Sequence, residues 1–274
     1  MKVSFFGIGS QKAATSWLYT CLTDHPETNM PIKEIHFFSK EENWRKGIKW
    51  YENIFKCKKK DNVNGEFSTS YLYSKVCADR IYNYNPEAKI IVSIRDPYER
   101  TISHFNHCKA NGQIRQEISL TKAIKIRPDL IKNSLISEML EYYIDKFGNS
   151  KVHIITYKEI LDNPIEVLKK TAIFLNINSD FISFSLNKKV NKTYNIKNLC
   201  IDKFISKTAR FIESIGLSSF LLTARKFGLT EIIRSLNRSR TQTKFVFKYH
   251  EKKLLDTFFI KENLKINEIL KKYK

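Results

Sequence analysis

The chain has 274 residues, of which 42% are hydrophobic and 13% aromatic, enough to form the core of one large domain and too many for a disordered chain. Lysine and arginine number 48 against 28 aspartate and glutamate, so the net charge is +20 and favours anionic partners such as phosphates, nucleic acid or an anionic surface. The charge does not select among these partners, because scattered lysines also solvate an ordinary surface.

Five cysteines lie far apart, with no C-x-x-C pair and no histidine cluster to complete a zinc site: Cys21, Cys57, Cys77, Cys108 and Cys200. We expect buried free thiols. The N-terminal apolar run is too short for a signal peptide, and no apolar stretch approaches the roughly 20 residues that a membrane span needs. These features predict a cytoplasmic protein with no metal site and no transmembrane segment.

Short runs of β-branched residues predict buried parallel strands, and patterns with helical spacing lie between them. In chain order, the predicted elements are strand 3–8, helix 17–23, strand 89–94, helix 98–110, helix 135–147, strand 152–157 and helix 164–175. Strands that alternate with helices predict an α/β fold, with a P-loop-like central parallel sheet flanked by helices on both faces. Ligands of such sheets bind beyond the carboxyl ends of the strands.

From about residue 196 the strand signal weakens and helical patterns dominate. Two helices and one short strand are predicted there, at 204–215, 254–270 and 245–247. No internal repeat or low-complexity linker separates this region from the rest. We therefore expect a single domain over 1–274, with an α/β core at 1–195 and a helical C-terminal region at 196–274 that packs on the sheet or covers its ligand.

The loop after the first predicted strand consists mainly of small residues and leads directly into a helix. Such a loop presents free backbone N–H groups and the positive end of the helix to an anion. Lys12, Thr15 and Ser16 add one charge and two hydroxyl groups. The loop does not match the nucleotide-triphosphate pattern G-x-x-x-x-G-K-[ST], because Gln11 and Ala13 flank the lysine. A magnesium-dependent P-loop kinase is thus a disfavoured alternative, and an ordinary strand-to-helix turn stays open for this loop taken alone.

The segment from Phe6 to Leu18 resembles the loop of sulfotransferases that use 3′-phosphoadenosine 5′-phosphosulfate (PAPS), where the pattern is close to G-x-x-K-x-G-T-[TS]-x-L. In that family the loop holds the 5′-phosphosulfate of the donor. The resemblance implies that the cofactor contacts Gln11, Lys12, Ala13, Ala14, Thr15, Ser16 and Trp17. Ala14 stands where the family usually has glycine, and its methyl group narrows the conformations open to the loop.

A second motif follows the strand predicted at 89–94. Arg95 ends this strand and Ser103 lies eight residues further on, which resembles the 3′-phosphate motif of the same family. An arginine can bind phosphate through two parallel hydrogen bonds, although Arg95 and Asp96 also fit a local salt bridge. Together with the first loop, this motif predicts a donor with phosphate at two ends. Lys192 falls where family members carry a loop that covers the cofactor.

Residues 31–38 resemble the K-E-x-H-F-F segment of carbohydrate and many bacterial sulfotransferases. In heparan-type members the glutamate is the general base, a catalytic role that the resemblance implies for Glu34. His36 is the alternative base, although a histidine among aromatic residues is more often a hydrogen-bonded core residue, and Lys33 with Glu34 also fits a surface ion pair. Phe67 replaces the lysine of the G-E-K-[ST]-P-x-Y segment that assists sulfonate transfer, which weakens the case for a polysaccharide acceptor.

The resemblance extends over about residues 1–195 and implies a sulfotransferase. Such an enzyme moves a sulfonate group from PAPS to a hydroxyl or amine of a small-molecule or sugar acceptor by in-line displacement and releases adenosine 3′,5′-bisphosphate. Lys12 would serve the leaving phosphate and Glu34 or His36 the acceptor, with no metal and no specific nucleic acid partner. The rival hypothesis is a non-catalytic basic module that binds nucleic acid or a membrane surface, which predicts clustered cations and no two-phosphate site.

Overall fold

A computed structural model describes residues 2–56, 62–187, 195–196, 238–239 and 249–273. Its centre is a parallel sheet of five strands in the order β2-β3-β1-β4-β5. The strands are β1 (Phe5–Gly9), β2 (Thr28–Asn29), β3 (Val63–Phe67), β4 (Lys89–Ile94) and β5 (Val152–Thr156). Two further strands, β6 (Asn195–Ile196) and β7 (Arg238–Ser239), pair with each other in antiparallel fashion.

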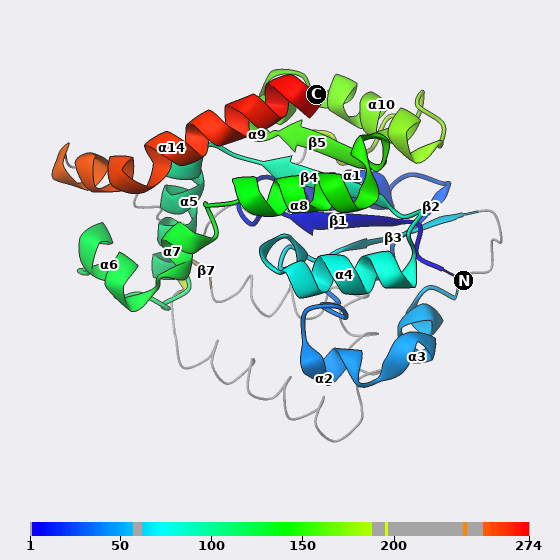
Figure 1. Cartoon of the computed structure of the whole chain (residues 1–274), viewed down its shortest axis with the longest axis horizontal. Coiled ribbons are helices and arrows are strands. Elements are labelled where there is room, and N and C mark those ends of the chain that lie inside the picture. The colour runs from blue at the N-terminus through cyan, green and yellow to red at the C-terminus, as the bar shows by residue number, and fades with distance from the viewer. Residues whose placement is uncertain (1, 57–61, 188–194, 197–237, 240–248, 274) are drawn as a thin grey trace.

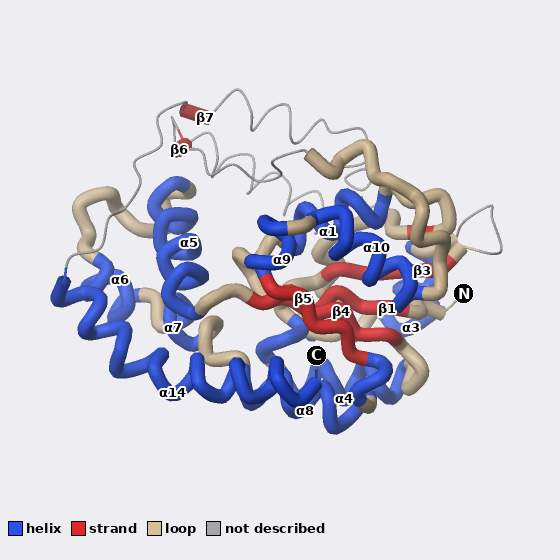
Figure 2. The backbone as a smooth tube through the Cα atoms, turned by 90° about the horizontal axis from the view of Figure 1, so that it is seen from above, coloured by secondary structure: helices blue, strands red, loops and turns tan. Residues whose placement is uncertain are grey.

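Helices cover both faces of the sheet. One face carries α1 (Thr15–Thr23), α9 (Tyr157–Asp162) and α10 (Pro164–Leu175), and the other carries α4 (Lys75–Tyr84), α8 (Ser137–Phe147) and α14 (Tyr249–Tyr273) (Figure 2). Beyond the carboxyl ends of the strands lie α5 (Pro97–Ala110), α6 (Leu120–Ile126) and α7 (Asp129–Lys132) (Figure 1). The remaining helical elements are α2 (Glu41–Trp44), α3 (Gly47–Ile54), η1 (Tyr71–Tyr73) and η2 (Asn149–Lys151). The predicted α/β architecture is confirmed.

Successive side chains of a strand point to opposite faces, and the two layers of the core follow from this alternation. Phe6 and Ile90 pack in the layer beneath α4 and α8, whereas Phe5 and Ile91 pack in the layer beneath α1 and α10. Strands predicted at 89–94 and 152–157 appear as β4 and β5, the latter one residue shorter. Strand β1 begins two residues later than predicted, at Phe5.

Strand β3 is absent from the sequence prediction, because it contains a glycine and two polar residues where a buried strand is usually apolar. One of them, Glu66, is fully buried and accepts hydrogen bonds from the hydroxyl groups of Tyr51 (2.5 Å), Ser68 (2.6 Å) and Tyr71 (2.7 Å). Burial raises the pKa of Glu66 to about 7, against the opposing effect of these hydrogen bonds. Ser68 Oγ also accepts the backbone N–H of His36 (2.9 Å), so the buried carboxyl group fixes the turn after β3.

The C-terminal helix α14 contains the helix predicted at 254–270 and packs on the core. Leu255 and Phe259 join the apolar cluster of α5 and α6. Glu262 accepts the backbone N–H groups of Ile136 and Ser137, both at 2.7 Å, and so places a carboxylate at the positive end of α8. The helix predicted at 204–215 and the strand predicted at 245–247 lie outside the described residues.

Three of the five cysteines can be assessed. Cys77 and Cys108 are buried free thiols, as expected, Cys21 is also buried, and Cys57 and Cys200 lie outside the described ranges. None of the helices in the described part of the chain combines the length and the apolar character needed to cross a membrane.

Candidate active site

Two segments that carry predicted site residues, and one turn that contacts such residues, follow neighbouring strands of the sheet. The loop of residues 10–14 follows β1, Arg95 follows β4, and the turn of residues 68–70 follows β3. Because β3, β1 and β4 are adjacent and parallel, all three segments lie at the carboxyl edge of the sheet. The segment that carries Glu34 joins this edge through a hydrogen bond from the Glu34 backbone N–H to the Phe67 carbonyl (2.7 Å).

The loop between β1 and α1 and the first turn of α1 hold a run of backbone donors that the described residues do not bind. Within the part of the chain that the structure describes, the N–H groups of residues 12–17 have no hydrogen-bond partner, whereas that of Leu18 donates to the Ala14 carbonyl (3.1 Å). Lys12 and Ala14 have left-handed φ angles of 71° and 61°, which are typical of turns whose successive N–H groups converge. Free N–H groups and the positive end of α1 together give this loop the features of an anion site.

Strand β4 holds this loop in place through Ser93. The Ser93 carbonyl accepts the backbone N–H of Ser10 (2.6 Å), and its hydroxyl donates to the carbonyl of Ala13. On the other side, the backbone N–H of Gln11 donates to the hydroxyl of Tyr73 (3.0 Å). Ser93 was not predicted to act at the site, but a serine within the apolar run of β4 was the signal that could have found it.

Lys12 is half-buried and adjoins several other cations. Burial lowers the pKa of Lys12 to about 8, Cys108 opposes this shift, and the charges of Arg100 and Arg95 add to it. The largest contributions to this shift include no carboxylate among the described residues. Because a nearby negative charge would favour the protonated amine again, Lys12 is suited to bind an anion.

Arg95 joins the two predicted anion sites. Its Nη1 donates to the carbonyl of Lys12 (3.3 Å), its Nε pairs with Glu99 (3.0 Å), and its guanidinium lies 4.2 Å from the ring centroid of Tyr157. The salt bridge thus forms with Glu99, one helical turn on, and holds the guanidinium beside the loop. Ser103 is half-buried on α5, and its hydroxyl has no partner in the described part of the chain.

The carboxylate of Glu34 is held by four groups. Thr69 donates its backbone N–H to Oε2 and its hydroxyl to Oε1, both at 3.0 Å. Lys33 Nζ lies 3.4 Å from Oε1 and His36 Nε2 lies 3.3 Å from Oε2. The Glu34 side chain nevertheless keeps 29% of its surface exposed, so an acceptor can reach it.

Lys33 and His36 link this carboxylate to its surroundings. Lys33 Nζ donates to Ser16 Oγ (2.9 Å), which connects Glu34 to the first turn of α1. His36 Nδ1 shares a hydrogen bond with Ser70 Oγ (2.8 Å). Burial lowers the pKa of His36 and outweighs the opposing effect of Glu34, which favours a neutral ring. Lys33 therefore does more than form the surface pair considered from the sequence.

The structure does not place the side chains of two predicted cofactor residues, Trp17 and Lys192, at the candidate site. The indole of Trp17 packs in the core and its Nε1 donates to the Leu186 carbonyl (3.0 Å), which leaves only the backbone N–H of Trp17 to face an anion. Lys192 lies outside the described residues.

Arg100 was not predicted as a site residue, but this cation lies close enough to the Lys12 loop to lower the pKa of Lys12. It is 1% exposed and donates to Ser134 Oγ (2.5 Å) and to the Leu130 carbonyl (2.6 Å). Asp129 partly offsets the charge of Arg100, but this charge still lowers the pKa of Lys12 and so adds to the positive potential around it. An arginine on the buried face of α5 was the available signal.

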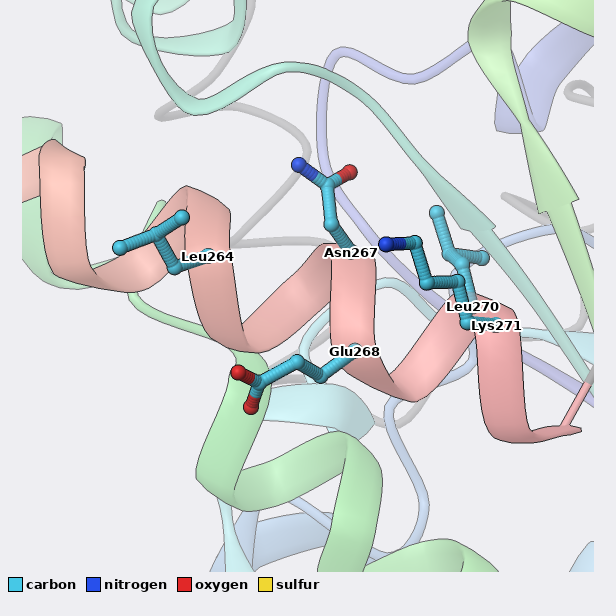
Figure 3. A pocket seen from close by; sticks show the side chains of 5 residues that line it. All are labelled: Leu264, Asn267, Glu268, Leu270 and Lys271. Carbon is cyan, nitrogen blue, oxygen red and sulfur yellow. The ribbon is translucent and has the colours of Figure 1, made fainter.

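A surface pocket of ≈ 450 Å³ lies elsewhere, on α14 (Figure 3). Its lining residues are Leu264, Asn267, Glu268, Leu270 and Lys271. Because all five come from one helix and none belongs to the predicted site, we assign no chemistry to this pocket. In the described ranges, no group of three or more histidine, cysteine, aspartate or glutamate side chains is arranged to hold a metal ion.

Comparison with known proteins identifies the family. The sulfotransferase domain family matches residues 4–210. The chain belongs to this family. The solved structure of a sulfotransferase from Alicyclobacillus acidocaldarius superposes with a TM-score of 0.61 at 23% identity, over 84% of this chain and 96% of that one. A sulfotransferase domain from the curacin biosynthetic pathway superposes with a TM-score of 0.51 at 14% identity, over 70% and 79%. These likenesses show that the fold is that of a sulfotransferase domain.

The sequence relatives of this sulfotransferase domain include enzymes named for heparan sulfate. Heparan sulfate glucosamine 3-O-sulfotransferase 5 of Mus musculus is 27% identical over 181 residues, which cover 62% of this chain and 52% of that protein. Bifunctional heparan sulfate N-deacetylase/N-sulfotransferase 3 of Homo sapiens is 33% identical over 195 residues, 63% of this chain and 22% of that protein. The sulfotransferase domain thus spans about half, or less, of the length of these relatives.

Two departures of this sulfotransferase domain from the family pattern have visible consequences. Ala14, in place of the usual glycine, adopts a left-handed conformation that costs a non-glycine residue about 1–2 kcal/mol. Phe67, in place of the lysine, is 1% exposed, and its ring covers Gly7 and packs edge-on against Tyr19. Position 67 therefore supplies a core side chain and no cation.

Proposed function

We propose that this chain transfers a sulfonate group from PAPS to a hydroxyl or amine of a small-molecule or sugar acceptor and releases adenosine 3′,5′-bisphosphate. The observation that carries this proposal is the hydrogen bond from Arg95 Nη1 to the Lys12 carbonyl, which joins two cationic elements at one edge of the sheet. A donor with phosphate at two ends fits such a pair of elements. The names of the heparan sulfate relatives support a sugar among the possible acceptors.

The chemistry of the step is an in-line displacement at sulfur. Negative charge grows on the oxygen that leaves with the 5′-phosphate, and a proton leaves the acceptor. Lys12 and the free N–H groups of residues 12–17 are suited to the leaving phosphate. Glu34, whose carboxylate is oriented by Thr69 and partly exposed, is suited to take the acceptor proton, with His36 as a neutral hydrogen-bond partner.

The proposed donor site can be tested by titration with nucleotides. We expect adenosine 3′,5′-bisphosphate to bind about 10 to 100 times more tightly than AMP, because only the bisphosphate engages a second charged contact. Isothermal titration calorimetry measures both affinities, and incubation with labelled PAPS and a panel of alcohols and amines measures transfer. Equal affinities for the two nucleotides would contradict the two-site proposal, and tight binding of ATP that depends on magnesium would favour a kinase.

Substitution at the 3′-phosphate motif should weaken donor binding selectively. We expect Arg95→Ala to weaken bisphosphate binding more than Ser103→Ala, because a charge-assisted contact contributes about 1.5–3 kcal/mol and a neutral hydroxyl about 1 kcal/mol. Glu99→Gln is a matched control, since it removes the partner of Arg95 and leaves the guanidinium in place. A greater loss for Ser103→Ala than for Arg95→Ala, in folded proteins, would show that the 3′-phosphate lies elsewhere.

A further inference from the structure

The ammonium group of Lys33 lies between the two ends of the proposed reaction. Its Nζ is 2.9 Å from Ser16 Oγ, in the first turn of α1, and 3.4 Å from Glu34 Oε1. Ser16 belongs to the run of free N–H groups that faces the donor, and Glu34 is the proposed base for the acceptor. A group that passes from donor to acceptor must cross the space between them.

We propose that Lys33 is a further catalytic residue, whose ammonium binds the sulfonate oxygens while the group moves from the donor to the acceptor. This inference rests on the proposed function. The Lys33 side chain is 23% exposed, so its charge is partly shielded from water and acts more strongly on a neighbouring anion than a fully solvated lysine would. Three N–H donors allow it to contact the sulfonate and keep one protein partner.

Position 67 cannot supply this second cation. Strand β3 leads to the same edge of the sheet, but its last residue is Phe67, whose ring is buried over Gly7. Lys12, the other lysine of the site, follows β1, and its carbonyl accepts a hydrogen bond from Arg95, although the charge of Lys33 also acts on its ammonium group. Of the described cations at this edge, Lys33 is the one that contacts both the first turn of α1 and the carboxylate of Glu34.

In the proposed transfer step, the acceptor, the leaving phosphate, Glu34 and Lys33 have separate roles. A lone pair of the acceptor oxygen or nitrogen forms a bond to sulfur, while the bond from sulfur to the bridging oxygen breaks and its electron pair remains on the 5′-phosphate. The acceptor proton passes to Glu34. The three sulfonate oxygens carry negative charge throughout, and Lys33 offsets it. Before the donor binds, the same ammonium pairs with Glu34, so contact with the sulfonate also releases a carboxylate oxygen for the proton.

The test separates sulfonate contact from nucleotide binding. Lys33→Met should lower kcat by about 30 to 100 times, while the affinity for adenosine 3′,5′-bisphosphate, which lacks the sulfonate, should change by less than about threefold. Lys33→Arg, which keeps the positive charge, should have a kcat between those of Lys33→Met and the native chain. Lys40→Met is the matched control, because it removes the same charge from an exposed side chain of the same segment, and its kcat should remain within about threefold of the native value.

A second measurement distinguishes catalysis from orientation of Glu34. If Lys33 acts on the sulfonate, Lys33→Met should lower the residual kcat of Glu34→Gln by a further factor of about 30, whereas a residue that only positions Glu34 adds no loss. No further loss, or near-native kcat in Lys33→Met alone, would overturn the inference. If the native chain transferred no sulfonate from PAPS, the proposed function itself would fail instead. Lys33→Gln serves in the same way if circular dichroism shows that the methionine variant is unfolded.

Discussion

Replacement of Glu34 by glutamine is expected to lower turnover by about 10² to 10⁴ times and to leave the affinity for adenosine 3′,5′-bisphosphate almost unchanged. Glutamine nearly preserves the size of the side chain and can still accept a hydrogen bond from Thr69, but it cannot take a proton from the acceptor. The measurement is steady-state kinetics with labelled PAPS, together with nucleotide titration and circular dichroism.

Glu42→Gln is the control for the loss of one carboxylate, because the Glu42 side chain is 76% exposed and lies in the same segment of the chain. Raised pH should partly restore Glu34→Gln activity toward an amine, which can lose its proton to solvent, and scarcely at all toward an alcohol. Near-native turnover of a folded Glu34→Gln protein would exclude Glu34 as the base and favour His36. Loss of bisphosphate binding would assign Glu34 to the donor pocket.

Lys12→Met should weaken donor binding and also lower turnover, since we propose that this cation contacts the donor both before and during transfer. The binding defect carries a pH signature. In the native chain the pKa of Lys12 is about 8, and a bound phosphate must raise it because the protonated amine is the form that attracts the anion. Bisphosphate affinity should therefore fall as pH rises above about 8, by up to about tenfold per pH unit, until the pKa of the complex is reached.

Nucleotide titration between pH 6.5 and 10 measures this profile. The phosphates, with a second pKa near 6, are almost fully ionised above about pH 8, so the slope in that range reports groups of the protein. Lys12→Met should remove the slope, and Lys12→Arg should flatten it because the guanidinium stays charged. Cys108→Ala tests the neighbouring thiol, whose pKa burial raises above its ordinary value; it should keep a slope of the same size but move it to lower pH, because Cys108 opposes the lowering of the Lys12 pKa. A native profile that is flat, or a slope that survives in Lys12→Met, would be incompatible with a charged Lys12 at the donor site.

The sequence allowed the prediction of those parts of the fold that depend on local pattern. Strands β1, β4 and β5 are mainly apolar runs, each followed by residues that favour a turn. The loop that carries Lys12 is a recognisable motif between a strand and a helix. Strand β3 escaped prediction because Glu66, its fourth residue, is stabilised by hydroxyl groups that only the folded chain brings together. A charged residue in such a strand contradicts every local rule, and only its tertiary partners explain it.

The residues of the candidate site also fall into two groups, those that a local sequence motif predicts and those that only tertiary contacts reveal. Lys12, Glu34 and Arg95 belong to motifs whose residue types and spacing are visible in the sequence. Lys33 and Arg100 were missed because their significance depends on distant partners, Ser16 for one and the segment around Leu130 for the other. Sequence spacing gives no indication of which of many lysines and arginines will face another charged group in the folded chain.

The pairing of β1 with β3 also constrains how this chain can change over evolutionary time. In the register of the two strands Gly7 lies opposite Phe67 and Gly65 lies opposite Phe5, and each aromatic ring fills the space that its glycine leaves open. Replacement of Phe67 by lysine alone would uncover Gly7 and disturb the core packing, whereas a larger residue at position 7 alone would collide with the ring. Neither single step is neutral, so the two positions are epistatic. A lineage that carries phenylalanine at position 67 is thereby held to it until both sites change together.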